Sequence, residues 1–182
     1  MALATKPLIL ALDLGRQCGF CVGLCGGGVP ISGSWKLSSG GDSHGVAYDQ
    51  LIRRLEEMHA EFRPTIIFKE DNRALRIAFN SKEQRRIASV KMTDGLHAMV
   101  EMMGVRLGVP VKEANMDTVR KHFIGIARLG DRDLLKRTVV DRAILLKYMT
   151  RGSTDDDQAD ACAVWDWAAS TIGSPIGQLV LT

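Results

Sequence analysis

Four acidic residues stand where separate segments of the chain could bring carboxylates together. Asp13 ends one apolar run (LILALD), Glu70 follows another (TIIFK), and Asp157 and Asp160 open an alanine-rich segment near the C-terminus. Carboxylate oxygens are the ligands that Mg²⁺ and Mn²⁺ prefer, and two such ions can clamp the attacking and leaving oxygens of a phosphodiester. The pattern therefore predicts a metal-dependent nuclease.

The last acidic segment offers two pairs at helical spacing. Asp157 and Asp160 lie at i and i+3, and Asp156 and Asp160 lie at i and i+4, so either pair would share one face of a helix. Asp157 would also stand near the positive end of the helix dipole, which favours its ionised form. Taken alone, the acidic run 155–157 is equally typical of an N-cap cluster.

The net charge of +3 is unevenly distributed. Residues 63–91 hold eight Lys or Arg against three Asp or Glu, and residues 120–151 hold nine against three. Two basic stretches beside an acidic, cation-recruiting site favour a polyanionic partner such as nucleic acid. Solvated helix faces are the other interpretation of each stretch.

Length and composition bound the architecture. With 182 residues, 46% apolar and 25% charged, the chain fits one globular domain over residues 1–182, with residues 172–182 as a tail of uncertain order. The sequence contains neither a secretory h-region nor a spanning apolar run, so we expect a soluble, cytoplasmic protein and no membrane partner. The four cysteines include a C-x-x-C pair but no second pair at ligand spacing, which favours cysteines that act as small core residues.

Hydrophobic periodicity predicts how strands and helices alternate. Five strands are expected at residues 8–14, 19–25, 29–37, 65–69 and 109–113, the first three as an antiparallel meander. Helices are expected at residues 44–62, 81–103, 116–123 and 131–148, with a final helix starting near Asp157. This order predicts an α/β fold in which helices flank a mixed sheet. The apolar residues expected to face inward from the helix at 131–148 are Leu134, Leu135, Val139, Ile144 and Leu145.

Three local sequences carry a resemblance to a known family. The segments ILALDLGRQCGFCVG, TIIFKED and DQADACAVW resemble the RuvC-type Holliday-junction resolvases of the RNase H-like nuclease superfamily, and the resemblance extends over roughly residues 8–170. It implies an RNase H-like mixed five-stranded sheet flanked by helices. It also implies that Asp13, Glu70, Asp157 and Asp160 are the catalytic residues and metal ligands, which selects Asp157 over Asp156.

The same resemblance implies the cofactor and the partners. Two Mg²⁺ ions, with Mn²⁺ able to substitute, would serve a homodimer that makes paired nicks across a four-way DNA junction. A nucleoid-associated protein that works with recombination or helicase proteins is then expected. The methionines of residues 99–103 suit either the dimer contact or the core.

Basic residues near the acids are the candidates for binding DNA. Arg73 stands where members of this family tend to place an aromatic residue, and Arg120 matches a basic residue of the family. The side chains expected to contact backbone phosphates are Arg73, Arg76, Lys82, Arg85, Arg86, Arg120 and Lys121.

Three other functions fit parts of the pattern. A related RNase H-like nuclease acting on other branched DNA, an RNA/DNA hybrid or structured RNA would use the same metal chemistry. A structure-selective DNA-binding protein without activity would keep the basic surface. The first strand and its hairpin also resemble the phosphate-binding strand of actin-like and sugar-kinase ATPases, but that fold needs two such domains.

Overall fold

A mixed five-stranded sheet forms the centre of the molecule. The computed structural model describes residues 6–71 and 84–173, with the side chains of residues 84–89 outside the description. The strands are arranged in the order β3-β2-β1-β4-β5. β1 (Leu8–Asp13), β2 (Gln17–Leu24) and β3 (Ile31–Lys36) form the expected antiparallel meander, while β4 (Ile66–Glu70) and β5 (Val111–Ala114) continue the sheet parallel to β1. The predicted mixed sheet is confirmed.

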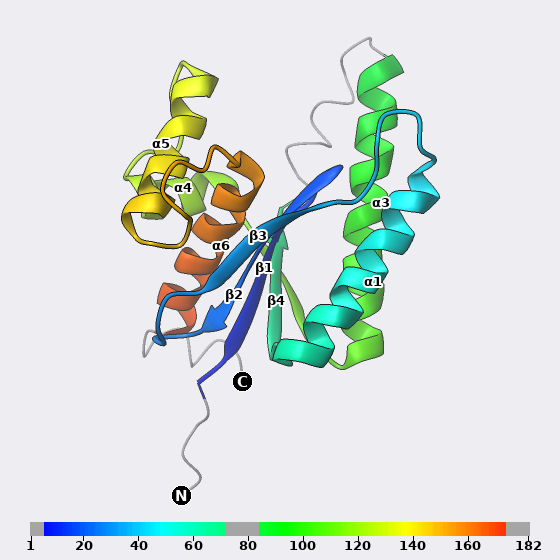
Figure 1. The fold of residues 1–182 in the computed structure, drawn as a ribbon, viewed down its shortest axis with the longest axis horizontal. Coiled ribbons are helices and arrows are strands. Elements are labelled where there is room, and N and C mark those ends of the chain that lie inside the picture. Colours follow the sequence, from blue (N-terminus) through cyan, green and yellow to red (C-terminus); the bar gives the residue numbers. More distant parts are fainter. Residues whose placement is uncertain (1–5, 72–83, 174–182) are drawn as a thin grey trace, which may run out of the picture.

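Helices cover both faces of the sheet (Figure 1). α1 (His44–Phe62) and α3 (Gln84–Leu107) cover one face, and α4 (Met116–Ile124), α5 (Arg132–Leu145) and α6 (Asp156–Gly173) cover the other. Successive strand residues point to opposite faces, so Ile9 and Ala11 of β1 enter the core beneath α6 while Leu10 and Leu12 enter the core beneath α1 and α3. Two separate cores result.

Small residues bring α6 close to the sheet. Ala159, Ala161 and Ala163 are buried in the first half of the helix. The indole nitrogen of Trp165 donates a hydrogen bond of 3.2 Å to the carbonyl of Gly23, a residue of β2. The four cysteines, Cys18, Cys21, Cys25 and Cys162, are free and buried, which confirms the interpretation of cysteine as a core residue.

The inward face of α5 agrees with the prediction only in part: Val139 is buried and Ile144 packs against the same core as predicted, but Leu134 and Leu145 do not face inward. Leu134 and Leu145 are 46% and 71% exposed, whereas Val139, Val140 and Ala143 are buried against α6. The helix ends at Leu145, three residues earlier than expected, and its packing face follows the small and β-branched residues that allow a close approach to the alanines of α6. The largest apolar residues of α5 were therefore poor guides to its orientation.

Lys69 is a buried cation on the α3 side of β4. Its ammonium lies 2.8 Å from a carboxylate oxygen of Glu113, 3.1 Å from one of Glu101 and 3.3 Å from Nδ1 of His97. Burial and the neighbouring ammonium lower the pKa of His97 to about 4, so the ring is neutral beside Lys69. This network joins α3 to β4 and β5 on the face opposite the next residue, Glu70.

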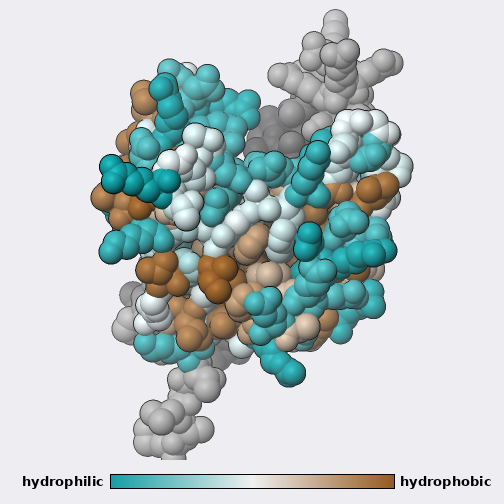
Figure 2. Space-filling view, viewed as in Figure 1, coloured by the Kyte–Doolittle hydropathy of each residue, from teal (hydrophilic) through white to brown (hydrophobic). Residues whose placement is uncertain are grey.

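The two ends of the sheet differ in polarity. Figure 2 shows hydrophilic residues over the outer sides of the helices and a group of apolar residues low on the face, near the end where β1 begins. The exposed hairpin residues Leu24, Val29 and Ile31 belong to that end. The opposite end, where β1 and β4 finish, carries the acids. No helix in residues 6–71 and 84–173 is long and apolar enough to cross a membrane.

Candidate active site

Strand alternation directs Asp13 and Glu70 to the same side of the sheet. Ile9 and Ala11 precede Asp13 on the α6 side of β1, and Ile66 and Phe68 precede Glu70 on the same side of β4. The two strands are parallel neighbours whose last recorded pair joins the residues just before these acids. Asp13 and Glu70 consequently lie side by side, and each carboxyl group affects the pKa of the other.

A glycine in β2 brings α6 to these two acids. Gly19 is the antiparallel partner of Asp13, and a Cβ added to it would lie 1.9 Å from the carbonyl oxygen of Asp157. Since this contact involves backbone atoms of α6, no side-chain rearrangement could relieve it. The absence of a side chain at Gly19 therefore allows the first turn of α6 to rest on the sheet beside Asp13.

The four predicted acids form one electrostatic cluster. Burial raises the pKa of Asp13 well above its ordinary value, and the charges of Asp160, Glu70 and Asp157 raise it further. The pKa of Glu70 is raised by burial and then by Asp160. Burial, with help from neighbouring carboxylates, raises the pKa of Asp157 to about 6. Carboxylates this close resist ionisation together, so the cluster is suited to a cation.

Arg120 of α4 forms an ion pair with one acid of the cluster. One of its terminal nitrogens lies 3.4 Å from a carboxylate oxygen of Asp160, and its charge opposes the rise in the pKa of both Asp160 and Glu70. Its Nε is buried without a hydrogen-bond partner among the described residues. Arg120 therefore compensates part of the negative charge at the inner edge of the site.

The three consecutive acids before Gln158 have different surroundings. Asp155 caps α6 by accepting from the backbone of Gln158 at 3.0 Å, and its other oxygen accepts from Ser34 of β3 and, at 3.2 Å, from Gln17 of β2. Asp156 forms an ion pair with Lys136 of α5. The charge of Asp157 raises the pKa of Asp13.

Sequence reasoning missed Gly19 and Lys136, and it left open which acid of the run 155–157 would cap the helix. The D-D-D run signalled a helix start, but which acid would cap the helix depended on Gln17 and Ser34, which lie far away in the chain.

Most of the predicted DNA-binding residues cannot be placed from the described structure. Arg73, Arg76 and Lys82 lie outside the described residues, and Arg85 and Arg86 belong to the first turn of α3, with side chains outside the description. Arg120 lies against the acids, and Lys121 is exposed on α4. Only these last two can be related to the cluster by position.

The donor set fits a hard divalent cation. In residues 6–71 and 84–173, no three His, Cys, Asp or Glu side chains are spaced closely enough to enclose an ion as they stand. The donors at the end of β1 are nevertheless all carboxylates, partly buried and mutually repelling, which is the chemistry that Mg²⁺ and Mn²⁺ favour. Asp13, Glu70, Asp157 and Asp160 are the residues that would hold it.

The strand order and the helices on both faces define an RNase H-like fold. Within that class, the chain is structurally similar to the RuvC and Ydc2 Holliday junction resolvases. For Thermus thermophilus RuvC the TM-score is 0.61 at 17% identity, covering 86% of this chain and 90% of the other. For T. thermophilus RuvC in complex with a Holliday junction substrate, the TM-score is 0.62 and the sequence identity is 15%, and the match covers 86% of this chain and 89% of the other. For the yeast mitochondrial Holliday junction resolvase Ydc2, the TM-score is 0.56 and the sequence identity is 14%, and the match covers 88% of this chain and 76% of the other.

These structural similarities establish the fold. No protein-family model matches the chain, and comparison with curated protein sequences finds no significant match.

Replacing Gly19 by alanine should displace the first turn of α6. The added methyl group would meet the backbone of Asp157, so we expect a loss of about 1–3 kcal/mol in the free energy of unfolding, measured with urea. Any Mg²⁺-dependent nicking should fall roughly a hundredfold, because a small displacement misaligns reacting groups. Gly28→Ala is the matched control, since a Cβ at Gly28 meets no atom within 4 Å. Wild-type stability and nicking in Gly19→Ala would contradict this account.

Asp13→Asn should stabilise the metal-free protein at pH 7. The native pKa of Asp13 is raised above its ordinary value of 3.8, so the native state holds its proton to higher pH, and stability falls as the pH rises through that interval. The variant lacks this penalty and should be more stable than the wild type at pH 7 in urea unfolding with EDTA. The gain should shrink as the pH falls toward 4.

Asp49→Asn serves as the control for this experiment, because Asp49 pairs with Arg53 on the exposed surface of α1. A gain that is equal at pH 7 and pH 4, or a gain of the same size in the control, would show that charge repulsion at Asp13 is not its cause.

Proposed function

We propose that this protein is a Mg²⁺-dependent endodeoxyribonuclease that resolves four-way (Holliday) or other branched DNA junctions by paired nicks. The observation that carries the proposal is the convergence of four carboxylates, from β1, β4 and α6, at one end of the sheet. The fold supports it, because solved Holliday junction resolvases have a similar structure and one of them was determined with a Holliday junction substrate.

In this proposal the residues of the cluster have separate tasks. Asp13, whose pKa is raised by all three of the other acids, would hold the ions together with Glu70, Asp157 and Asp160. When bound, the ions supply Lewis-acid chemistry at the scissile phosphodiester, and Mn²⁺ would serve in place of Mg²⁺. The products would carry 5′ phosphate and 3′ hydroxyl ends.

Arg120 would act between the protein and the substrate. Its guanidinium faces Asp160 while the site holds only carboxylates, and its charge also acts on Glu70. Arg120 would also bind a backbone phosphate, because a guanidinium can contact phosphate oxygens in a bidentate manner. Lys121, exposed on the same helix, would add a second phosphate contact.

Paired nicks require two sites, which is why the proposal includes a homodimer. Val105 is 85% exposed near the end of α3, and Met102 on the same helix is partly exposed. Met103, by contrast, is buried in the core beneath α1 and α3, so the methionines at 99–103 do not all face outward. The exposed apolar residues of α3 support a contact there, and recombination or helicase proteins would be further partners.

Two alternative functions follow from the same site. A nuclease for other branched DNA, an RNA/DNA hybrid or structured RNA would use identical carboxylates, because these acids contact the phosphodiester and its ions, not the bases. A DNA-binding protein without activity would not need an acidic cluster whose members raise one another's pKa. The substrate panel and the metal titration below separate these alternatives from junction resolution.

Asp13→Asn should abolish nicking of a synthetic four-way junction in Mg²⁺ while leaving junction binding largely intact. The substitution removes a carboxylate that would hold the two proposed metal ions, but it leaves the basic surface unchanged. Nicking is measured on end-labelled strands, and binding by gel shift in Ca²⁺ or EDTA. Cleavage at the wild-type rate by the variant would rule out the assigned site.

A substrate panel completes this test. We expect the wild-type protein to cut the four-way junction faster than a flap, a plain duplex or an RNA/DNA hybrid. Faster cleavage of the hybrid would favour the alternative nuclease, and absence of Mg²⁺ or Mn²⁺ binding in calorimetry, even with junction DNA present, would favour the inactive DNA-binding protein.

A further inference from the structure

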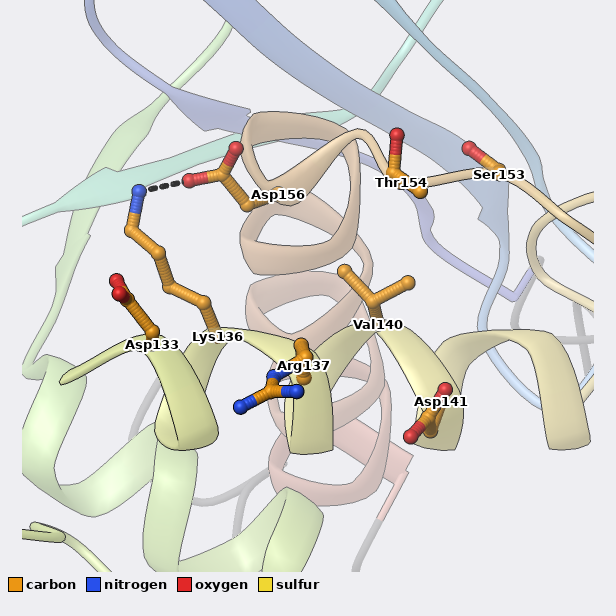
Figure 3. A pocket seen from close by; sticks show the side chains of 8 residues that line it. All are labelled: Asp133, Lys136, Arg137, Val140, Asp141, Ser153, Thr154 and Asp156. Carbon is orange, nitrogen blue, oxygen red and sulfur yellow. Dashed lines mark hydrogen bonds and ion pairs between the residues drawn. The ribbon is translucent and has the colours of Figure 1, made fainter. Parts of the chain in front are cut away.

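Asp156 is held by a lysine from a different helix. Lys136 projects from α5 and pairs with the carboxylate of Asp156 in the first turn of α6, as Figure 3 shows. The two side chains are 40% and 35% exposed, and they form one wall of an open pocket of about 390 Å³ between α5 and the segment 153–156. The carboxylate of Asp156 is therefore engaged on the α5 side of α6.

The acids on either side of Asp156, Asp155 and Asp157, are each held in place by other contacts. Asp155 is committed to the helix cap and to hydrogen bonds from β2 and β3. The backbone of Asp157 rests on Gly19, which fixes the rotation of the first turn. Asp156 lies four residues before Asp160 and shares a helix face with it, but its carboxylate pairs with Lys136 instead.

The charges around the cluster agree with this division. Asp156 raises the pKa of both Asp157 and Asp160, and Lys136 lowers the pKa of both. The pair thus lies within electrostatic reach of Asp157 and Asp160. Loss of Lys136 would leave an additional carboxylate, without its cation, next to a cluster that already repels itself.

We propose that Lys136 is a positioning residue that keeps Asp156 out of the acidic cluster and thereby leaves Asp157 and Asp160 as the pair facing Asp13. This inference rests on the proposed function, because it assumes that the cluster binds divalent cations. It adds a determinant outside the four acids: α5 selects which of two adjacent aspartates serves the site.

Mg²⁺ binding to the DNA-free protein, measured by calorimetry, tests the proposal. Asp156→Asn should leave the affinity within about twofold of wild type, whereas Asp157→Asn should weaken it by roughly tenfold or more. In Lys136→Met the freed Asp156 can replace Asp157. The double variant Lys136→Met/Asp157→Asn should therefore recover most of the lost affinity, and adding Asp156→Asn should remove the recovery.

Arg137 provides a matched control. It is the next residue of α5, lines the same pocket and makes no ion pair with the described residues. Arg137→Met removes the same charge from the pocket, so Arg137→Met/Asp157→Asn should stay as weak as Asp157→Asn. Lys136→Arg/Asp157→Asn, which keeps the cation, should also stay weak. Thermal melting of each metal-free variant verifies that it is folded.

The outcomes distinguish a failure of the role assigned to Lys136 from a failure of the proposed function. Equal weakening by Asp156→Asn and Asp157→Asn, or a recovery in Lys136→Met that persists without Asp156, would overturn the role of Lys136 alone. Recovery in the Arg137→Met control would do the same, because general electrostatics would then explain it. Absence of Mg²⁺ binding by the wild-type protein, with and without junction DNA, would overturn the proposed function, and the assignment to Lys136 would fall with it.

Discussion

The contact between the first turn of α6 and Gly19 of β2 is the constraint on which the candidate site depends. Gly19 pairs with Asp13 in the sheet, and the carbonyl of Asp157 occupies the space that a side chain would fill. Because the sheet sets the position of Asp13 and this contact sets the position of α6, acids far apart in the chain meet without a dedicated loop. The buried alanines of α6 extend the same close approach along the helix. The packing of α6 on the sheet therefore also positions the acids of the candidate site.

The cluster gathers charge at a cost to stability. Burial and mutual repulsion raise the pKa of Asp13, Glu70 and Asp157, which means that each ionised carboxylate opposes folding at neutral pH. Arg120 offsets part of this cost from α4, and Lys136 offsets part from α5. Both cations come from the helices that pack beside α6, so the surroundings of the site compensate a repulsion that a bound divalent ion would relieve more completely.

Local patterns predicted the elements well, but not the contacts between them. Alternation and helical spacing located the strands and helices, and the similarity of the fold to solved resolvases agrees with the sequence resemblance. The prediction for α5 was wrong at Leu134 and Leu145, which are exposed, and right at Val139, which is buried. The partners of Asp155 and Asp156 could not be predicted either, since Gln17, Ser34 and Lys136 approach them only through the tertiary fold.

The end of β4 shows how one strand keeps two ionised groups apart. Lys69 and Glu70 are adjacent in the chain, yet alternation sends Lys69 into the α3 side and Glu70 to the acidic cluster. Glu101 and Glu113 neutralise Lys69 on its own side, and Arg120 moderates Glu70 on the other. A lysine directed toward the cluster would compete with any cation there. Placing its ammonium across the sheet, with its own carboxylates, therefore preserves the negative potential that the proposed metal chemistry requires.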